Sequence, residues 1–218
     1  MRLYLLRHGE VTSYRGDAPI TADGEREAFE VGQGFGRREE QLIEILSGDT
    51  RRAMGTAAHL ARGVVDAGGR VVGPGVAFAL RNPDLYIAGV RVDMAGSPDA
   101  FADQVNGLSG EDVASLEFFP DFVASPDRIG WWLVHESPPG EDASSIAARV
   151  RSFAASLVDP IPGRPDVVVA VTHSPVLRAV GLDFLGRDIG EPLWVSGLVV
   201  SVESDRKMSI DLFGVEAR

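Results

Sequence analysis

The stretch that decides the fold is Val167-Val168-Val169-Ala170-Val171-Thr172-His173-Ser174-Pro175. Its first five residues are all apolar and mostly β-branched, which is typical of a strand buried on both faces of a parallel sheet. Ser174 is a favoured N-cap residue and Pro175 a favoured first helical residue, so we expect a helix to begin here. A buried parallel strand followed directly by a helix is a building unit of α/β proteins.

The same alternation of strand and helix recurs on both sides of this unit. Apolar runs predict strands at residues 2–6, 42–46 and 71–72, and an antiparallel hairpin at 193–202 and 207–213. Apolar residues at helical spacing predict helices after Thr21, over about 50–64, over 146–157 and from 176 onward. The expected fold is α/β: a three-layer αβα sandwich with a mostly parallel sheet and an antiparallel edge.

Regular periodicity is lost between Gly73 and Pro139, a stretch with prolines, glycines and scattered aromatic residues. A segment of this length is too long for a bare loop. We therefore expect one domain over residues 1–218 with a partly helical cap inserted at about 75–140. The aromatic residues of the cap are expected to form a small core of their own more often than to contact substrate.

Composition limits the classes of function. The chain has 218 residues, of which 44% are hydrophobic and 24% charged, as is usual for a globular protein with a sizeable core. A net charge of −11 disfavours nucleic acid and membrane surfaces as partners, although a few arginines in a cleft can still attract a small anion. The absence of cysteine excludes disulfides and thiolate chemistry. No signal peptide or apolar run of about 18 residues is found, so a cytoplasmic protein is expected.

Two histidines, His8 and His173, directly follow apolar strands, and ligand sites of open α/β sheets lie beyond the carboxyl ends of the strands. Arg7 precedes His8, and Arg52 falls in the first turn of the predicted helix after the second strand. Guanidinium groups match phosphate oxygens, and a neutral imidazole is a competent nucleophile. A second, protonated imidazole would donate to a phosphate oxygen. These residues predict phosphoryl transfer with no metal or other cofactor.

Further segments carry a resemblance to a known family. They are Leu6-Arg7-His8-Gly9-Glu10, Ala18-Pro19-Ile20-Thr21-Ala22-Asp23-Gly24, Ser47-Gly48-Asp49-Thr50-Arg51-Arg52-Ala53-Met54-Gly55-Thr56-Ala57, Pro139-Gly140-Glu141-Asp142 and Val171-Thr172-His173-Ser174. In this order they resemble the R-H-G-E, P-L-T-x-x-G, S-x-x-x-x-R-A-x-x-T-A and G-E-S segments and the second-histidine strand end of the histidine phosphatase superfamily, the phosphoglycerate mutase-like proteins. The resemblance covers nearly the whole chain except the cap.

The resemblance implies a role for each matching residue. His8 would be the nucleophile that forms a phosphohistidine, and Arg7, Arg52 and His173 would form the phosphate pocket. Arg52, and not its neighbour Arg51, matches the arginine of the family segment. An acid from the cap would protonate the leaving group. Water would then cleave the phosphohistidine, or a second hydroxyl would accept the phosphoryl group.

The sequence departs from the family where the proton donor is expected. The family's donor is a glutamate after a leucine early in the cap, whereas Leu80-Arg81-Asn82-Pro83-Asp84-Leu85 contains none. Asp84 is the candidate acid in its place, and Glu136 and Glu10 are the alternatives.

A second departure lies in the substrate-binding residues. The asparagine that follows R-H-G-E in phosphoglycerate mutases is missing here, and Arg15 is expected to take over part of its role. Glu10 and Thr172 are the other residues expected to contact substrate. The acidic segment Gly140-Glu141-Asp142 also lacks the family's serine.

Taken together, these features favour a phosphomonoester hydrolase that acts on a small organic phosphate through a phosphohistidine at His8. A phosphoglycerate mutase-type isomerase is the first alternative, and the missing asparagine and altered acid region count against it. A phosphate- or phosphoprotein-binding module with weak turnover is the second. A protein phosphohistidine phosphatase is the third, although such enzymes tend to lack a large cap. No feature of the sequence indicates an oligomeric state.

Overall fold

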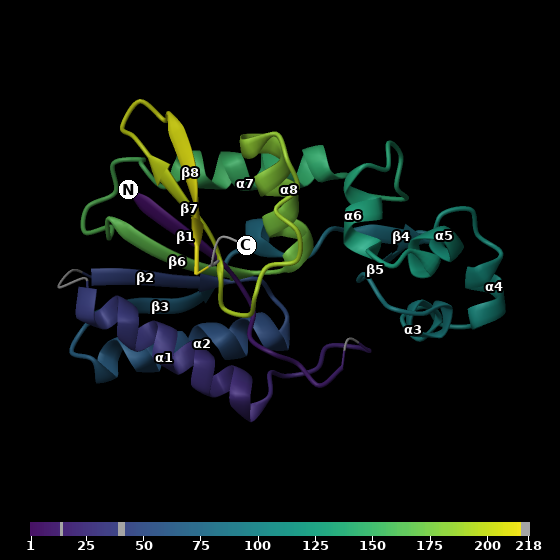
Figure 1. The fold of residues 1–218 in the computed structure, drawn as a ribbon, viewed down its shortest axis with the longest axis horizontal. Coiled ribbons are helices and arrows are strands. Elements are labelled where there is room, and N and C mark those ends of the chain that lie inside the picture. The colour runs from purple at the N-terminus through teal and green to yellow at the C-terminus, as the bar shows by residue number, and fades with distance from the viewer. Residues whose placement is uncertain (14, 39–41, 215–218) are drawn as a thin grey trace.

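A mixed sheet forms the centre of the fold (Figure 1). The computed structural model describes residues 1–13, 15–38 and 42–214. Its sheet contains β1 (Arg2–Arg7), β2 (Leu42–Ser47), β3 (Arg70–Val76), β6 (Val167–Thr172), β7 (Gly197–Val202) and β8 (Met208–Phe213), in the order β3-β2-β6-β1-β7-β8. The strands from β3 to β1 are parallel, and β7 and β8 add an antiparallel edge. The predicted fold is therefore confirmed.

Helices cover the sheet on both faces (Figure 1). They are α1 (Ala22–Arg38) and α2 (Arg51–Asp66) on one face, and α7 (Ala143–Ser156) and α8 (Ser174–Leu185) on the other. Alternate residues of β6 serve the two cores: Val167, Val169 and Val171 face α1 and α2, whereas Val168 and Ala170 face α7 and α8. The whole strand is buried. An unbroken apolar run is needed here because neither face of the strand meets water.

The residues between β3 and α7 form a cap that lies to the right of the sheet in Figure 1. It contains η1 (Phe78–Leu80), the hairpin of β4 (Leu85–Ile87) and β5 (Val90–Val92), and the short helices α3 (Pro98–Ala102), α4 (Gly110–Ala114), α5 (Phe119–Ala124) and α6 (Arg128–Leu133). Phe101 packs edge-on against Phe119 with ring centroids 4.8 Å apart, and Trp132 is fully buried. This aromatic core is continuous with the core under α7 and α8, which anchors the cap to the sheet.

Two local predictions were wrong. β3 continues through Gly73 to Val76, where the loss of pattern predicted the start of the irregular segment. Parallel pairing with β2 uses backbone groups, and an edge strand tolerates glycine and proline. Ser174 is the first residue of α8 and not its N-cap, which is His173. Because its hydroxyl donates to Glu191, Ser174 does not cap the helix.

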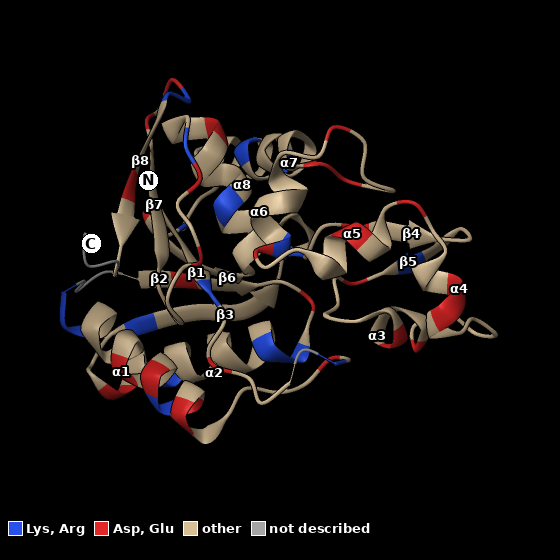
Figure 2. Ribbon diagram, turned by 45° about the vertical axis from the view of Figure 1, so that its right-hand side comes forward, with Lys and Arg blue, Asp and Glu red and all other residues tan. Residues whose placement is uncertain are grey.

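Charge is distributed unevenly over the surface. Figure 2 shows acidic residues along α1 and on the cap helices α3, α4 and α5. In the part of the chain that the structure describes, no helix combines the length and apolar character needed to cross a bilayer.

Candidate active site

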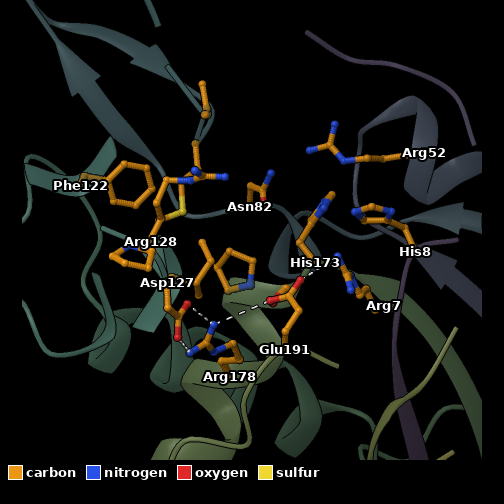
Figure 3. Close-up of a pocket in the computed structure, with 17 residues that line it drawn as sticks. Arg7, His8, Arg52, Asn82, Phe122, Asp127, Arg128, His173, Arg178 and Glu191 are labelled. Carbon is orange, nitrogen blue, oxygen red and sulfur yellow. Dashed lines mark hydrogen bonds and ion pairs between the residues drawn. The ribbon is translucent and has the colours of Figure 1, made fainter. Parts of the chain in front are cut away.

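A cavity of about 440 Å³ opens between the sheet and the cap (Figure 3). Its lining includes Arg7, His8 and Arg52 from the sheet side, Asn82, Met94, Phe122, Asp127 and Arg128 from the cap, His173, Ser174 and Arg178 from the start of α8, and Glu191 from the loop after α8. The volume is in the range of small-molecule sites.

Strand register places the two histidines side by side. β1 pairs in parallel with β6 so that Arg7 lies opposite Thr172. The next residues, His8 and His173, leave the strands together, and their ring centroids are 5.3 Å apart. The N–H of His8 donates to the carbonyl of Thr172 at 3.0 Å, which extends the pairing beyond the strand end.

Arg52 reaches the same point from α2. Thr50 caps this helix by accepting a hydrogen bond from the N–H of Ala53, which fixes the first turn. Arg52 is then buried against the cavity, whereas Arg51 is exposed. The turn passes very close to the second histidine, because a Cβ on Gly48 would lie 3.4 Å from Nε2 of His173.

The surroundings of His8 set its protonation. Its Nδ1 lies 2.8 Å from the carbonyl oxygen of Gly9, to which it donates as a neutral ring, so Nε2 keeps its lone pair. Burial lowers the pKa of His8 to about 3, and the charges of Arg52 and Arg7 act in the same direction against the opposing effect of the Gly9 hydrogen bond. His8 is therefore neutral near pH 7, which is the state that a nucleophile requires.

His173 is buried at the centre of the cavity wall. Burial, together with the nearby Arg52 and His8, lowers the pKa of His173 well below its ordinary value. Neither of its ring nitrogens has a hydrogen-bond partner among residues 1–13, 15–38 and 42–214. Buried polar atoms of this kind normally have a partner. With Arg7 and Arg52 lining the same cavity, this end of it suits an anion with several acceptor oxygens.

The other predicted substrate contacts lie away from the cavity wall. Arg15 is exposed and pairs with Asp103 of the cap, Nη2 to Oδ2 at 2.6 Å. Glu10 accepts a hydrogen bond at 2.8 Å from the threonine that precedes α1. Thr172 is fully buried and donates to the carbonyl of Leu80 at 2.7 Å. A role of these three residues in substrate contact stays a prediction.

Asp84 fits the predicted role of proton donor no better. Its carboxylate accepts hydrogen bonds from Arg81, at 2.8 Å from Nη2, and from Arg91. Burial alone would raise the pKa of Asp84, but these hydrogen bonds outweigh it and hold the pKa below its ordinary value. Asp84 is also absent from the cavity wall, as are the alternatives Glu136 and Glu10. The ionised carboxylate of Asp84 instead ties the start of the cap to β5 through Arg91.

Sequence analysis missed the loop between α8 and β7, which wraps around Arg7. Oε1 of Glu191 lies 2.7 Å from Nη2 of Arg7, and the carbonyl of Pro192 accepts from Nη1 at 2.6 Å. The guanidinium carbon sits 3.5 Å from the ring centroid of Trp194. The sequence pattern predicted a strand over 193–202, whereas β7 begins only at Gly197, so residues 193–196 belong to this loop. The prediction was wrong there, because the apolar side chains of this segment pack from a loop instead of a strand.

Arg178 was missed as well. It is almost fully buried in α8 and binds Asp127 of the cap with Nη1 and Nη2 at 2.7 and 2.6 Å, and Asp188 with Nη2 at 2.5 Å. The sequence feature that indicates its importance is an arginine within the apolar run from Val176 to Gly181, because a charge in such a run needs a partner.

The described residues contain no cluster of three or more His, Asp or Glu side chains placed to hold a metal ion. The cationic end of the cavity is built from Arg7, Arg52, His8 and His173.

Comparison with known proteins identifies the family. The sequence model of the histidine phosphatase superfamily (branch 1) matches residues 3–67 and 117–203, which is well over half of the chain. The chain belongs to the histidine phosphatase superfamily. The resemblance found in the motifs is therefore confirmed. The unmatched stretch between the two ranges holds most of the cap.

Solved structures of similar fold include both phosphatases and a mutase. A mycobacterial glucosyl-3-phosphoglycerate phosphatase complexed with VO3 has a TM-score of 0.61 and 23% identity, over 100% of this chain and 99% of that one. A phosphoglycerate mutase from Bacillus anthracis has a TM-score of 0.60 and 14% identity, over 98% of this chain and 92% of that one. A putative α-ribazole-5′-P phosphatase from Escherichia coli has a TM-score of 0.57 and 18% identity, over 99% of each chain. No curated protein sequence matches the chain. At these identities the likeness shows the shared fold of the superfamily.

The Asp84→Asn variant tests the role that the structure gives this residue. Loss of the carboxylate leaves Arg81 and Arg91 without their shared partner, so the free energy of unfolding should fall by about 1–3 kcal/mol. The ratio of activities on alkyl phosphates and p-nitrophenyl phosphate should stay unchanged. Urea unfolding and initial rates measure the two effects. Asp205→Asn, which breaks an exposed pair with Lys207, is the matched control and should change the free energy of unfolding much less. A selective loss on alkyl phosphates would restore Asp84 as the acid.

The buried histidines should make the fold sensitive to mild acid. The folded pKa of His8 is about 3, whereas an unfolded histidine titrates near 6.5. Below pH ~6.5 the unfolded chain therefore binds a proton that the folded chain does not, and stability falls by up to ~1.4 kcal/mol per pH unit for each such group. His8→Gln should make the decline in unfolding free energy between pH 7 and pH 5 shallower in urea titrations. His59→Gln, outside the cavity, controls for removal of one imidazole. Identical slopes for wild type and His8→Gln would contradict the assignment.

Proposed function

We propose that this protein is a phosphomonoester hydrolase that acts on a small organic phosphate through a covalent phosphohistidine at His8, without a metal ion. The observation that carries the proposal is the state of His8: a neutral ring whose Nδ1 is held by the Gly9 carbonyl and whose Nε2 is free to attack. Membership of the histidine phosphatase superfamily supports the same chemistry.

In the first step, Nε2 of His8 attacks phosphorus in line with the ester oxygen, and the P–O ester bond breaks. Charge in such a transition state spreads over the non-bridging oxygens, so fixed donors around them supply most of the stabilisation. Arg7 and Arg52 line the cavity together with His8, which supports them as two of these donors.

His173 is the third donor in this proposal. Burial lowers the pKa of His173, but a bound phosphate dianion would favour the charged imidazolium. The proton that His173 takes up would then be shared with a phosphate oxygen, which satisfies a ring nitrogen that has no partner among the described residues. Water afterwards attacks phosphorus, the P–N bond breaks, and His8 returns to its neutral form.

The rest of the cavity suits the organic part of the substrate. Met94, Phe122 and Ile129 contribute apolar side chains from the cap to the lining, and Arg128 adds a positive charge. The cavity volume of about 440 Å³ leaves room for a small leaving group and not for a folded protein domain. This supports a small phosphorylated metabolite as the substrate.

His8→Ala should lower kcat by about 10⁴-fold or more on every phosphate ester that the wild type hydrolyses, because it removes the proposed nucleophile. Quenching the wild type with ³²P-labelled substrate should trap an acid-labile, base-stable label that maps to His8 by mass spectrometry. Transfer of label to a second hydroxyl of the same substrate, in place of release as phosphate, would indicate a mutase. Ligand binding without turnover would indicate a binding module. Near-normal activity of His8→Ala would end the proposal.

Chelation should leave hydrolysis unchanged, since guanidinium and imidazolium groups provide the positive charge of the proposed site. Initial rates are compared before and after dialysis against EDTA, with metal content checked by mass spectrometry. Vanadate, which mimics the pentacoordinate transition state, should inhibit. Arg52→Lys keeps the charge but not the planar fork, and should lower kcat about 10²-fold or more. Activity lost with EDTA and restored by Mg²⁺ or Zn²⁺ would contradict metal independence.

A further inference from the structure

The cavity lacks an obvious source for the proton that an alkoxide leaving group needs. Asn82, a cap residue that lines the cavity, carries an amide, which cannot give up a proton at neutral pH. Asp84 faces away among arginines. Only two carboxylates, Asp127 and Glu191, line the described cavity.

Asp127 is the weaker of the two. Arg178 binds both of its carboxylate oxygens, at 2.7 and 2.6 Å. These hydrogen bonds lower the pKa of Asp127 to about 2. Asp127 also caps α6 by accepting a hydrogen bond from the N–H of Gly130. Because both of its oxygens accept hydrogen bonds that stabilise the fold, the carboxylate stays ionised.

Glu191 has a different setting. Its side chain is 49% exposed, and it sits on a loop instead of in a helix. Oε1 lies 2.7 Å from Nη2 of Arg7, and Oε2 accepts a hydrogen bond from the Ser174 hydroxyl at 2.5 Å. Nη1 of Arg178 is 3.7 Å from Oε2. In Figure 3 the carboxylate lies between Arg7 and Arg178, at the edge of the space in front of His173.

Resting on the proposed hydrolase function, we propose that Glu191 is the catalytic acid and base of this enzyme. Its carboxylate is paired with the guanidinium group of Arg7, which the proposed function assigns to the phosphate. A bound dianion would compete with Glu191 for Arg7 and release the carboxylate from this ion pair. The released group, still bonded to Ser174, would lie beside the substrate and exchange a proton with it.

The proton balance closes over two steps. As Nε2 of His8 bonds to phosphorus and the ester P–O bond breaks, the carboxyl proton of Glu191 moves to the leaving oxygen and an alcohol departs. Water then attacks phosphorus and gives a proton to the Glu191 carboxylate, while the electron pair of the P–N bond returns to Nε2. Ser174 holds one carboxyl oxygen in both steps and keeps the group at the cavity edge.

The test is a leaving-group series of aryl and alkyl phosphates, assayed as kcat/KM with wild type, Glu191→Gln and Glu191→Asp. General acid catalysis contributes about 10²–10⁴-fold for poor leaving groups and little for p-nitrophenol. Glu191→Gln should therefore lose about that factor on alkyl phosphates and less than about tenfold on p-nitrophenyl phosphate, so that log(kcat/KM) depends steeply on leaving-group pKa. Glu191→Asp, which keeps a carboxyl group, should retain the shallow wild-type dependence at a reduced rate.

A second measurement tests the step in which water hydrolyses the phosphohistidine. With p-nitrophenyl phosphate, Glu191→Gln should release a burst of p-nitrophenol and accumulate phosphohistidine, because water lacks its base. Equal losses across the series would show that Glu191 only positions Arg7, and unchanged kinetics would remove it from the mechanism; either result overturns the proposal. Glu203→Gln, an exposed change elsewhere, is the matched control. His8→Ala on the same substrates separates this proposal from the hydrolase itself, because failure of the phosphohistidine route would appear in that variant and in the wild-type trapping.

Discussion

The parallel pairing of β1 with β6 is the constraint on which the candidate site depends. The register Arg7 to Thr172 sends His8 and His173 out of the sheet at the same level. This register is fixed because β6 is buried on both faces, and a shift of one residue would exchange the side chains that face the two helical layers. The geometry of the site is therefore set by apolar packing several residues away from the chemistry.

The same packing buries two positive charges, and nearby carboxylates neutralise them. Two guanidinium groups are buried beside two neutral imidazoles, in a protein whose net charge is −11. Glu191 lies on Arg7, and Asp17 lies 3.6 Å from Arg52. Such partners lower the cost of burying the arginines before substrate arrives. An anion entering the cavity must compete with them, so affinity reflects the difference between phosphate and carboxylate as partners. Bidentate geometry and double charge favour phosphate.

The sequence predicted the regular part of this arrangement and not the irregular part. His8 and His173 could be located because strands and helix starts leave local patterns, and strand ends in a parallel sheet must meet at one edge. Asp84 was misinterpreted because its direction depends on Arg91, a residue of the cap hairpin whose approach no local pattern encodes. Glu191 was missed for the same reason. Side chains in loops take their direction from tertiary pairing, and a single sequence shows their identity but not their partners.

The cap is held in place by contacts that bear directly on how the enzyme binds its substrate. Arg178 joins α8, the cap through Asp127 and the following loop through Asp188. The aromatic core of the cap is continuous with the core beneath α7 and α8. A cap fixed by both contacts presents the far wall of the cavity before substrate arrives. Preorganised donors and walls need no rearrangement at the moment of reaction, which is the condition under which electrostatic stabilisation is most effective. The movable group in this cavity is then the Glu191 carboxylate, whose half-exposed side chain can leave Arg7 without disturbing either core.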